Sequence, residues 1–306
     1  MATVEILLAT YNGEKYIREQ IDSILNQDYQ DWIVRACDDA SQDSTYEILK
    51  EYKNKYPEKF IIQRNEEGFG SAKLNFMNLI KNSECEYVMC CDQDDVWLPN
   101  KISLTLQTMK KNEEKGIPVL VHTDLKVVDE NLGIKSESFF QYSKLNKEAG
   151  YRELLIQNSV TGCTMMLNRE LVTLLNRDMN ISKILMHDWL AALIAAAKGK
   201  ICFVDEATIL YRQHSVNSVG AKQYGLALFI EKAKNHNIRK SLVDTTVQAA
   251  EVAEWYRDEL GTERYELTKQ YSEVFGKNKF ARVYFYIKNQ VLKSAFSRKI
   301  WQILLG

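Results

Sequence analysis

The stretch YVMCCDQDDVWLP, residues 87–99, joins a short apolar run to three carboxylates and an amide. Residues 87–91 have the length and the apolar character of a buried strand. Asp92, Asp94 and Asp95 follow directly, and their mutual repulsion disfavours joint ionisation unless a cation lies between them. The stretch therefore predicts a core strand that ends at a polar, cation-binding edge.

The segments before this strand alternate regularly between strand and helix patterns. Apolar runs indicate strands at residues 4–9, 32–37 and 60–62. Helical spacing of apolar residues follows each run, at residues 14–26, from residue 41 onward, and at residues 71–81. This alternation predicts an α/β fold with a Rossmann-like, mostly parallel sheet that is flanked by helices. Burial on both faces also explains why these strands are continuous apolar runs.

The later part of the chain has a more mixed pattern. We predict strands at residues 119–129, 161–167, 201–204 and 208–211, and helices at residues 148–157, 169–176 and 188–198. Helical patterns dominate from about residue 221. The chain therefore divides into a main domain over residues 1–220, with halves 1–100 and 101–220, and a helical C-terminal region over residues 221–306.

Polar residues follow three of the predicted strands, at the point where each strand ends. They are Thr10-Tyr11-Asn12, Asp38-Asp39, and Asp92 with Asp94. In open α/β sheets ligands bind beyond the carboxyl ends of the strands, so we expect these side chains to converge there. Taken singly, Asp39 could only cap the next helix, and Thr10 and Asn12 could only close a turn. Three polar strand ends together favour a ligand site.

Several of these residues suit particular chemistry. The pair Asp92 and Asp94 suits a hard divalent cation, Mg²⁺ or Mn²⁺, and Asp39 suits a ribose hydroxyl or the imide N–H of a pyrimidine. Asp188 begins an apolar helix, where it either caps the helix or accepts a proton from an attacking hydroxyl. Arg212 and His214 follow a strand; Arg212 suits a phosphate, and His214 suits a metal or a phosphate.

The composition is that of an ordinary globular protein. The net charge of −1 excludes the overall basic excess of a nucleic-acid-binding chain. The six cysteines form no Cys-x-x-Cys motif, which favours reduced thiols in a cytoplasmic protein. The N-terminus lacks the features of a signal peptide, and the longest helical apolar run, residues 189–197, is too short to cross a bilayer.

The C-terminal residues 277–306 differ from the rest of the chain in charge. They contain seven Lys or Arg and no Asp or Glu, whereas the remaining residues have a balance of −8. Apolar residues recur there at helical spacing, namely Phe280, Tyr284, Ile287 and Val291, and then Phe296, Ile300, Ile303 and Leu304. The pattern fits an ordinary packed helix with a solvated basic face. It also fits an amphipathic segment at an anionic membrane surface, and we predict peripheral attachment to the inner face of the plasma membrane.

The motifs that carry these residues resemble a known family. They are LLATYNGEKYIREQIDSILNQDY (7–29), CDDASQDST (37–45), NEEGFGSAKLNF (65–76), CDQDDVWLPNKI (91–102), VTGCTMMLNR (160–169), MHDWLAALIAAAKGK (186–200) and LYRQHSVNSVGA (210–221). In this order they resemble the inverting glycosyltransferases of family 2, which have the A-type fold. The combination is similar to bacterial rhamnosyltransferases of cell-wall and capsular polysaccharide synthesis. The resemblance covers residues 3–221, and Ala40 stands where the family most often has Gly.

The resemblance implies a role for each of the candidate residues. Thr10, Tyr11 and Asn12 would line the nucleotide pocket, Asp39 would contact the pyrimidine, and Asp92 would contact the ribose. Asp94 would hold the metal, Asp188 would be the base, and Arg212 and His214 would bind the diphosphate or its metal. Gly162 and Cys163 would let the backbone approach the donor sugar or the acceptor.

The resemblance also implies a reaction and its participants. An acceptor hydroxyl, deprotonated by Asp188, would displace the nucleoside diphosphate in one step, with Mg²⁺ or Mn²⁺ as cofactor. The donor would be dTDP-L-rhamnose or, alternatively, a UDP-hexose, and the acceptor would be a lipid-linked glycan.

Three other interpretations compete with this one. A haloacid-dehalogenase-like phosphatase would use an Asp-x-Asp motif, but that family carries the motif on its first strand. An HD hydrolase, suggested by His187-Asp188, would need a further ligand histidine on a helix upstream, where only His122 is present. A non-catalytic homologue would bind the nucleotide-sugar or partner proteins without turnover.

Overall fold

The computed structural model of the protein describes residues 3–214 and 237–306. They form two compact units. The first contains residues 3–139, 161–176 and 200–214, and the second contains residues 140–160, 177–199 and 237–306. The predicted domain boundary at residues 220–221 lies outside the described residues. The six cysteines are free thiols, and all except the half-buried Cys202 are buried.

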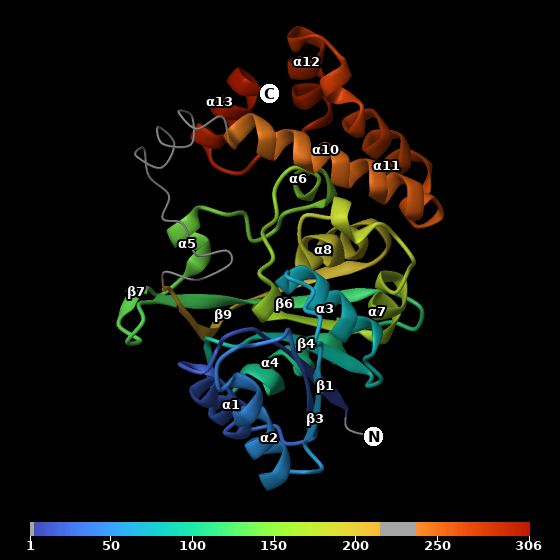
Figure 1. Ribbon diagram of the computed structural model, residues 1–306. Coiled ribbons are helices and arrows are strands. Elements are labelled where there is room, and N and C mark those ends of the chain that lie inside the picture. The colour runs from blue at the N-terminus through green and yellow to red at the C-terminus, as the bar shows by residue number, and fades with distance from the viewer. Residues whose placement is uncertain (1–2, 215–236) are drawn as a thin grey trace. The chain divides into compact units, whose positions relative to one another are not determined.

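The first unit is built on a mixed sheet, which the described residues form in the order β3-β2-β1-β4-β8-β6-β9-β5, with β7 paired to β6 (Figure 1). Four parallel strands confirm the predicted alternation: β1 (Val4–Thr10), β2 (Trp32–Asp38), β3 (Phe60–Arg64) and β4 (Tyr87–Asp92). Every residue of β1 is buried, which explains its unbroken apolar run.

The other strands enlarge this sheet. They are β5 (Val96–Trp97), β6 (Val119–Val128), β7 (Ile134–Ser136), β8 (Met165–Asn168) and β9 (Lys200–Arg212). β8 is antiparallel to both β4 and β6, and β9 is parallel to β6. The two strands predicted at residues 201–204 and 208–211 are one strand, β9. A shift in its pairing with β6 accommodates Asp205 and Glu206, which separate the two apolar runs.

Helices connect the parallel strands. The predicted helices correspond to α1 (Ile17–Leu25), α2 (Thr45–Lys55), α3 (Ala72–Lys81) and α7 (Arg169–Leu175). The order β3-β2-β1 followed by a return to β4 places α3 on the face opposite α1 and α2, because such crossovers are right-handed. The sequence interpretation omits α4 (Lys101–Asn112), although Ile102, Leu106 and Met109 recur at helical spacing and are buried.

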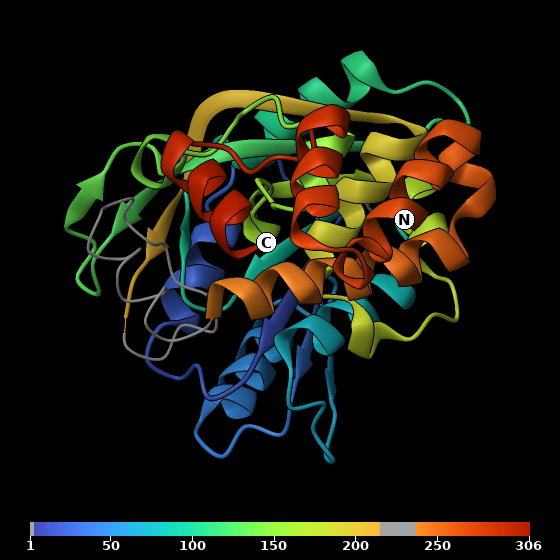
Figure 2. The ribbon, with the colours of Figure 1, turned by 90° about the horizontal axis from the view of Figure 1, so that it is seen from above.

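The second unit is helical. Its helices include α5 (Phe139–Ser143), α6 (Tyr151–Leu154), α8 (His187–Lys198), α10 (Asn237–Trp255), α11 (Arg257–Ser272), α12 (Lys279–Asn289) and α13 (Phe296–Leu305). The helices α10 to α13, coloured orange to red, lie together in both views (Figures 1 and 2). The helix predicted at residues 148–157 is limited to α6. Within the described residues, no helix has both the length and the apolar character needed to cross a membrane.

Candidate functional site

The pairing of the parallel strands brings the polar strand ends together, as predicted. Thr10 pairs with Asp38 across β1 and β2, and Ala9 pairs with Asp92 across β1 and β4. The Thr10 hydroxyl donates a hydrogen bond to Asp38 Oδ1 at 3.1 Å. β1 lies between β2 and β4, so the strand order reverses at this edge, which is where open α/β sheets bind ligands.

The two aspartates after β2 differ in what they contact. Asp38 accepts hydrogen bonds from the backbone N–H and the hydroxyl of Ser41, and so shapes the turn before α2. Asp39 accepts from Asn65 Nδ2 at 3.3 Å and from Gly70 N at 3.0 Å, and it also accepts from Phe69 N. The residue that precedes α2 is Ser44. Asp39 therefore does not cap α2; it holds the glycine-bearing loop over residues 65–70 beside the strand ends.

Ala40, between Asp39 and Ser41, lies in a backbone conformation that favours glycine. Ala40 has φ 60°, in the left-handed region. An L-residue is strained there by about 1–2 kcal/mol, whereas Gly is not. A glycine would avoid this strain, and this chain tolerates Ala at position 40.

A glutamine that the sequence interpretation left without a role holds the turn after β1. Gln93 Oε1 accepts from Tyr11 N at 2.8 Å, and Gln93 Nε2 donates to Tyr11 O at 2.8 Å. A Cβ on Gly13 would lie 2.2 Å from Gln93 Oε1, so a larger residue at position 13 would displace this amide. Asn12 N donates to Ser41 Oγ at 2.9 Å. Residues 10–13 are thus fixed to both neighbouring strand ends, while the Tyr11 side chain is exposed.

The predicted metal ligands Asp94 and His214 contact each other. Asp94 Oδ2 lies 2.7 Å from His214 Nε2, and both side chains are largely buried. The imidazole stacks on Tyr16, with ring centroids 5.0 Å apart. Carboxylate oxygen and imidazole nitrogen are donors that suit Mn²⁺ and, with water, Mg²⁺. The donor set therefore fits the divalent cation that the sequence predicts.

Arg212 links the backbone at Asp94 to other segments of the first unit. It is 2% exposed, and its guanidinium donates to Asp94 O at 2.8 Å and to Glu130 O at 2.6 Å. It also forms an ion pair with Glu19. Its guanidinium carbon lies 4.5 Å from the centre of the Tyr16 ring. Arg212 thus fixes the backbone that carries Asp94.

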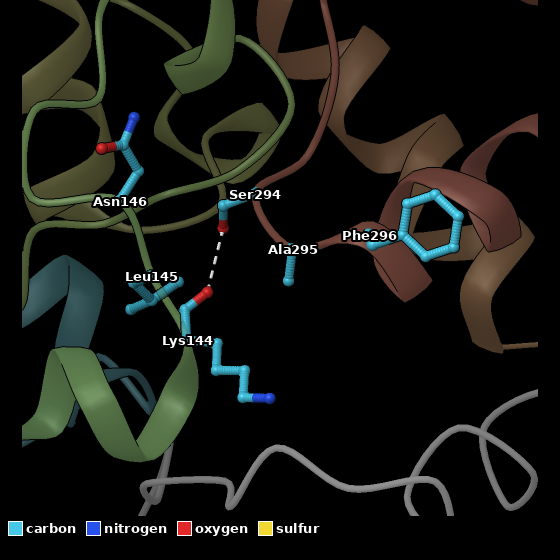
Figure 3. A pocket seen from close by; sticks show the side chains of 6 residues that line it. All are labelled: Lys144, Leu145, Asn146, Ser294, Ala295 and Phe296. Carbon is cyan, nitrogen blue, oxygen red and sulfur yellow. Dashed lines mark hydrogen bonds between the residues drawn. The ribbon is translucent and has the colours of Figure 1, made fainter.

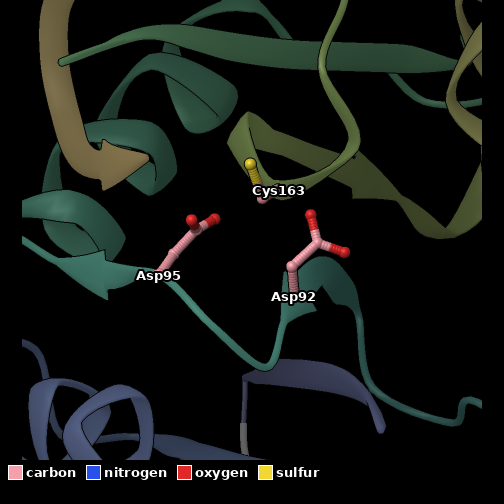
Figure 4. Close-up of side chains that lie close together, drawn as sticks. All are labelled: Asp92, Asp95 and Cys163. Atoms are coloured by element: carbon pink, nitrogen blue, oxygen red, sulfur yellow. The ribbon is translucent and has the colours of Figure 1, made fainter. Parts of the chain in front are cut away.

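Asp92, Asp95 and Cys163 lie close together at the end of β4 (Figure 4). One ligand atom from each lies within 4.8 Å of the others. Asp95 is fully buried and accepts from Arg212 N at 3.0 Å, and burial raises its pKa well above the usual range. Burial also raises the pKa of the Cys163 thiol, so this thiol stays protonated and is a poor ligand for a hard cation. The cluster therefore places a buried carboxyl and a buried thiol beside Asp92.

Lys101, to which the sequence interpretation assigned nothing, lies in the same unit. It is fully buried at the start of α4, with its ammonium 4.8 Å from the Trp97 ring centre. Burial lowers the pKa of Lys101 to about 8. The spacing of the apolar residues in α4 could have indicated that Lys101 is buried, because Lys101 directly precedes Ile102 on the buried side of the helix.

Asp188 belongs to the second unit. Met186 precedes α8 as its cap, so Asp188 is in the first turn and is not the N-cap. Its side chain is largely buried, and Asp188 Oδ1 accepts from Asn158 Nδ2 at 3.1 Å. Asn158 is itself fixed, because its Nδ2 donates to Val160 O at 2.8 Å and its Oδ1 accepts from Val160 N at 3.0 Å. No local pattern in the sequence indicated a role for Asn158. A carboxylate oriented in this way is suited to accept a proton.

The histidines do not support an HD hydrolase. His187 is buried in α8, and burial lowers its pKa to about 3. His122 lies on β6 rather than on a helix, and burial lowers its pKa to about 3 as well. The Asp-x-Asp motif follows β4, the fourth strand in the chain, which also disagrees with a haloacid-dehalogenase-like phosphatase.

Sequence comparisons identify relatives of this chain. Residues 5–174 match the model of the family "Glycosyl transferase family 2". The chain is 31% identical over 223 residues to the dTDP-rhamnosyl transferase RfbG of Shigella flexneri, which covers 70% of this chain and 74% of that protein. It is 30% identical over 128 residues to the putative glycosyltransferase EpsE of Bacillus subtilis, which covers 42% of this chain and 44% of that protein.

Solved structures show the same fold. S. aureus TarS 1–349 in complex with UDP superposes with a TM-score of 0.59 at 16% identity, over 91% of this chain and 73% of that chain. The mannosyltransferase PcManGT from Pyrobaculum calidifontis, in complex with GDP-Man and Mn²⁺, superposes with a TM-score of 0.58 at 15% identity, over 94% of this chain and 74% of that chain. Both similarities identify the A-type glycosyltransferase fold.

Proposed function

Since this chain belongs to glycosyl transferase family 2, we propose that it moves L-rhamnose from dTDP-L-rhamnose to a hydroxyl of a growing bacterial surface polysaccharide. The observation that carries this proposal is the relation to a dTDP-rhamnosyl transferase over 70% of the chain. A UDP-hexose is the second candidate donor, because TarS, of the same fold, forms a complex with UDP-GlcNAc.

The donor nucleotide would bind at the edge where β1, β2 and β4 end. In the proposal Thr10, Tyr11 and Asn12 line its pocket, Asp39 accepts from the pyrimidine imide, and Asp92 contacts the ribose. Support comes from the rigidity of this edge, since Gln93 and Ser41 fix the backbone of residues 10–13. Asp39 would recognise uracil and thymine alike, because both carry the same imide N–H.

A divalent cation, Mg²⁺ or Mn²⁺, would be held by Asp94 and His214. Bound there, it would stabilise negative charge on the diphosphate. The complex of PcManGT with Mn²⁺ supports metal use in proteins of this fold. Arg212 would bind the diphosphate. Its hydrogen bond to Asp94 O also positions the carboxylate that we assign to the metal.

Asp188 would act as the base. It would take the proton from the acceptor hydroxyl while that oxygen bonds to the anomeric carbon and the bond from this carbon to the diphosphate breaks. A single displacement of this kind inverts the anomeric configuration. The buried, hydrogen-bonded position of Asp188 supports this role, because Asn158 fixes the direction of its carboxylate.

The acceptor in this proposal is a lipid-linked glycan, and the protein would therefore work at the cytoplasmic face of the plasma membrane. The support is the charge of residues 277–306, which contain seven Lys or Arg and no acidic residue. Such a segment is attracted to anionic lipid.

Release of nucleoside diphosphate from a panel of donors tests the proposed function. With a lipid-linked glycan acceptor, dTDP-L-rhamnose should give the highest kcat/KM, and Asp94→Asn protein should be nearly inactive. A higher kcat/KM with a UDP-hexose would identify that sugar nucleotide as the donor and exclude dTDP-L-rhamnose. Absence of turnover with every donor, despite tight nucleotide binding, would favour a non-catalytic homologue.

A further inference from the structure

The last two helices of the second unit form a closed hairpin. Lys279 Nζ at the start of α12 donates to Leu304 O near the end of α13 at 2.9 Å, so the helices run in opposite directions. Gln302, 1% exposed, closes the turn between them: it accepts from Lys293 N at 2.9 Å and donates to Val291 O at 2.8 Å. The hairpin is therefore a defined element and not a loose tail.

One side of this hairpin packs on the second unit. Phe285 and Tyr286 of α12 are buried, and the Phe285 ring stacks on Tyr271 of α11 with centroids 6.2 Å apart. Val291, which the sequence places on the exposed stripe, is buried instead. The helix ends at Asn289 with Gln290 in a left-handed conformation, and this turns Val291 inward.

The opposite side of the hairpin is apolar and exposed. Among the described residues, six of the ten exposed large hydrophobic side chains lie on these two helices. They form one stripe on each helix, with spacings of three or four residues: Phe280, Tyr284 and Ile287 on α12, and Phe296, Ile300 and Leu304 on α13. This concentration in two short helices exceeds what scattered surface residues would give.

Basic side chains border this face. Lys277, Lys279, Lys288 and Lys299 are exposed, and residues 277–306 contain no acidic residue. Near the turn of the hairpin, an open pocket of about 410 Å³ is bordered by Lys144 and Phe296 (Figure 3). Arg298 donates to Lys144 O at 2.9 Å and so anchors α13 beside this lysine. The face thus combines exposed aromatic and aliphatic side chains with positive charge only.

We propose that the exposed face of the α12–α13 hairpin, defined by these six apolar side chains and the lysines beside them, is the surface that docks on an anionic phospholipid bilayer. Apolar side chains would enter the boundary between headgroups and acyl chains, and the lysines would contact anionic headgroups. The charge complementarity selects a lipid surface over a second copy of this chain, since two copies of an entirely basic face repel each other. This inference specifies the membrane attachment of the proposed function, but it does not depend on the donor or on turnover.

Vesicle flotation with the full chain tests this docking surface. The first variant changes three of the exposed hairpin residues: Phe280→Ser/Tyr284→Ser/Phe296→Ser. Its matched control changes three exposed hydrophobic residues elsewhere: Ile61→Ser/Ile134→Ser/Val247→Ser. The second variant, Lys277→Gln/Lys288→Gln/Lys299→Gln, has as control Lys81→Gln/Lys110→Gln/Lys111→Gln, with the same change in net charge. Circular dichroism and thermal unfolding establish that each variant is folded.

The wild type should float with vesicles of phosphatidylcholine and phosphatidylglycerol, and it should bind about tenfold less at high salt or with phosphatidylcholine alone. Both hairpin variants should bind at least about tenfold less, and both controls should bind like the wild type. Equal flotation of hairpin variants and controls, or no flotation of the wild type, would overturn the inference. Dimerisation that the serine variant abolishes, without vesicle binding, would overturn it in favour of a protein interface. Nucleoside diphosphate release with a water-soluble acceptor, measured in parallel, separates a failure of docking from a failure of the proposed reaction.

Discussion

Replacement of Asp188 by Asn tests the proposed base with little disturbance of the fold. The Asn158 amide donates to Asp188 Oδ1 at 3.1 Å, and the carbonyl of an asparagine at position 188 can accept the same hydrogen bond. Met186, not Asp188, caps α8, so the helix keeps its start. The substitution removes the negative charge and the ability to accept a proton, and it keeps the size of the side chain. A general base typically contributes about 10²- to 10⁴-fold, and we expect kcat to fall by that factor while the Kd for nucleoside diphosphate stays unchanged.

Asn158→Ala tests the same base more mildly, because it removes the hydrogen bond to Asp188 and leaves the carboxylate in place. A hydrogen bond to a charged group contributes about 1.5–3 kcal/mol, so transfer should slow by roughly tenfold to a hundredfold. Asn146→Ala is the matched control: Asn146 Nδ2 donates to Glu153 Oε2 at 2.8 Å at an exposed position of the same unit. Steady-state kinetics and isothermal titration supply both readouts. A loss below tenfold for Asp188→Asn, or equal kinetics for the two asparagine variants, would refute the assignment.

Three further predictions concern the first unit. Gly13→Ala should displace the Gln93 amide and lower the free energy of unfolding by about 1–3 kcal/mol, through two lost hydrogen bonds; an unchanged free energy in urea unfolding would contradict this. Asp94→Asn should lose most metal-dependent turnover, and a chelator should do the same. Asp95→Asn should be milder, because burial raises the pKa of Asp95 well above its usual range and so disfavours the charge that the amide lacks. Equal losses in the two variants would be inconsistent with a metal at Asp94. Burial lowers the pKa of His122 to about 3 in the folded protein. Below about pH 6.5, His122 therefore binds a proton in the unfolded chain but not in the folded protein. The free energy of unfolding should drop by up to about 1.4 kcal/mol per pH unit as the pH falls. His122→Gln should flatten that dependence in urea unfolding between pH 6 and 4, and a slope equal to the wild type would count against it.

The position of the site could be predicted from the sequence because its signals are local. An apolar run followed at once by Asp92 and Asp94 marks a strand and its end, and the alternation of strands and helices implies parallel pairing. Parallel pairing then places Thr10, Asp39 and Asp92 at one edge without any knowledge of side-chain contacts.

The contacts that orient these residues could not be predicted, since they join distant parts of the chain. Gln93 holds Tyr11 across 82 residues, and Asn158 holds Asp188 across 30. Local patterns were also misleading where the backbone departs from regularity. The shifted pairing at Asp205 makes two apparent strands one, and the left-handed Gln290 turns Val291, the last residue of an apolar stripe, inward. A glutamine carries no sequence signal for that conformation.

The anomeric configuration of the product, followed by NMR during turnover of dTDP-L-rhamnose with a hydroxyl acceptor, tests the proposed displacement most directly. We expect one equivalent of dTDP for each glycoside formed, and a glycoside whose anomeric configuration is opposite to that of the donor. A product with the donor's configuration, or release of inorganic phosphate or free sugar without a glycoside, would contradict it.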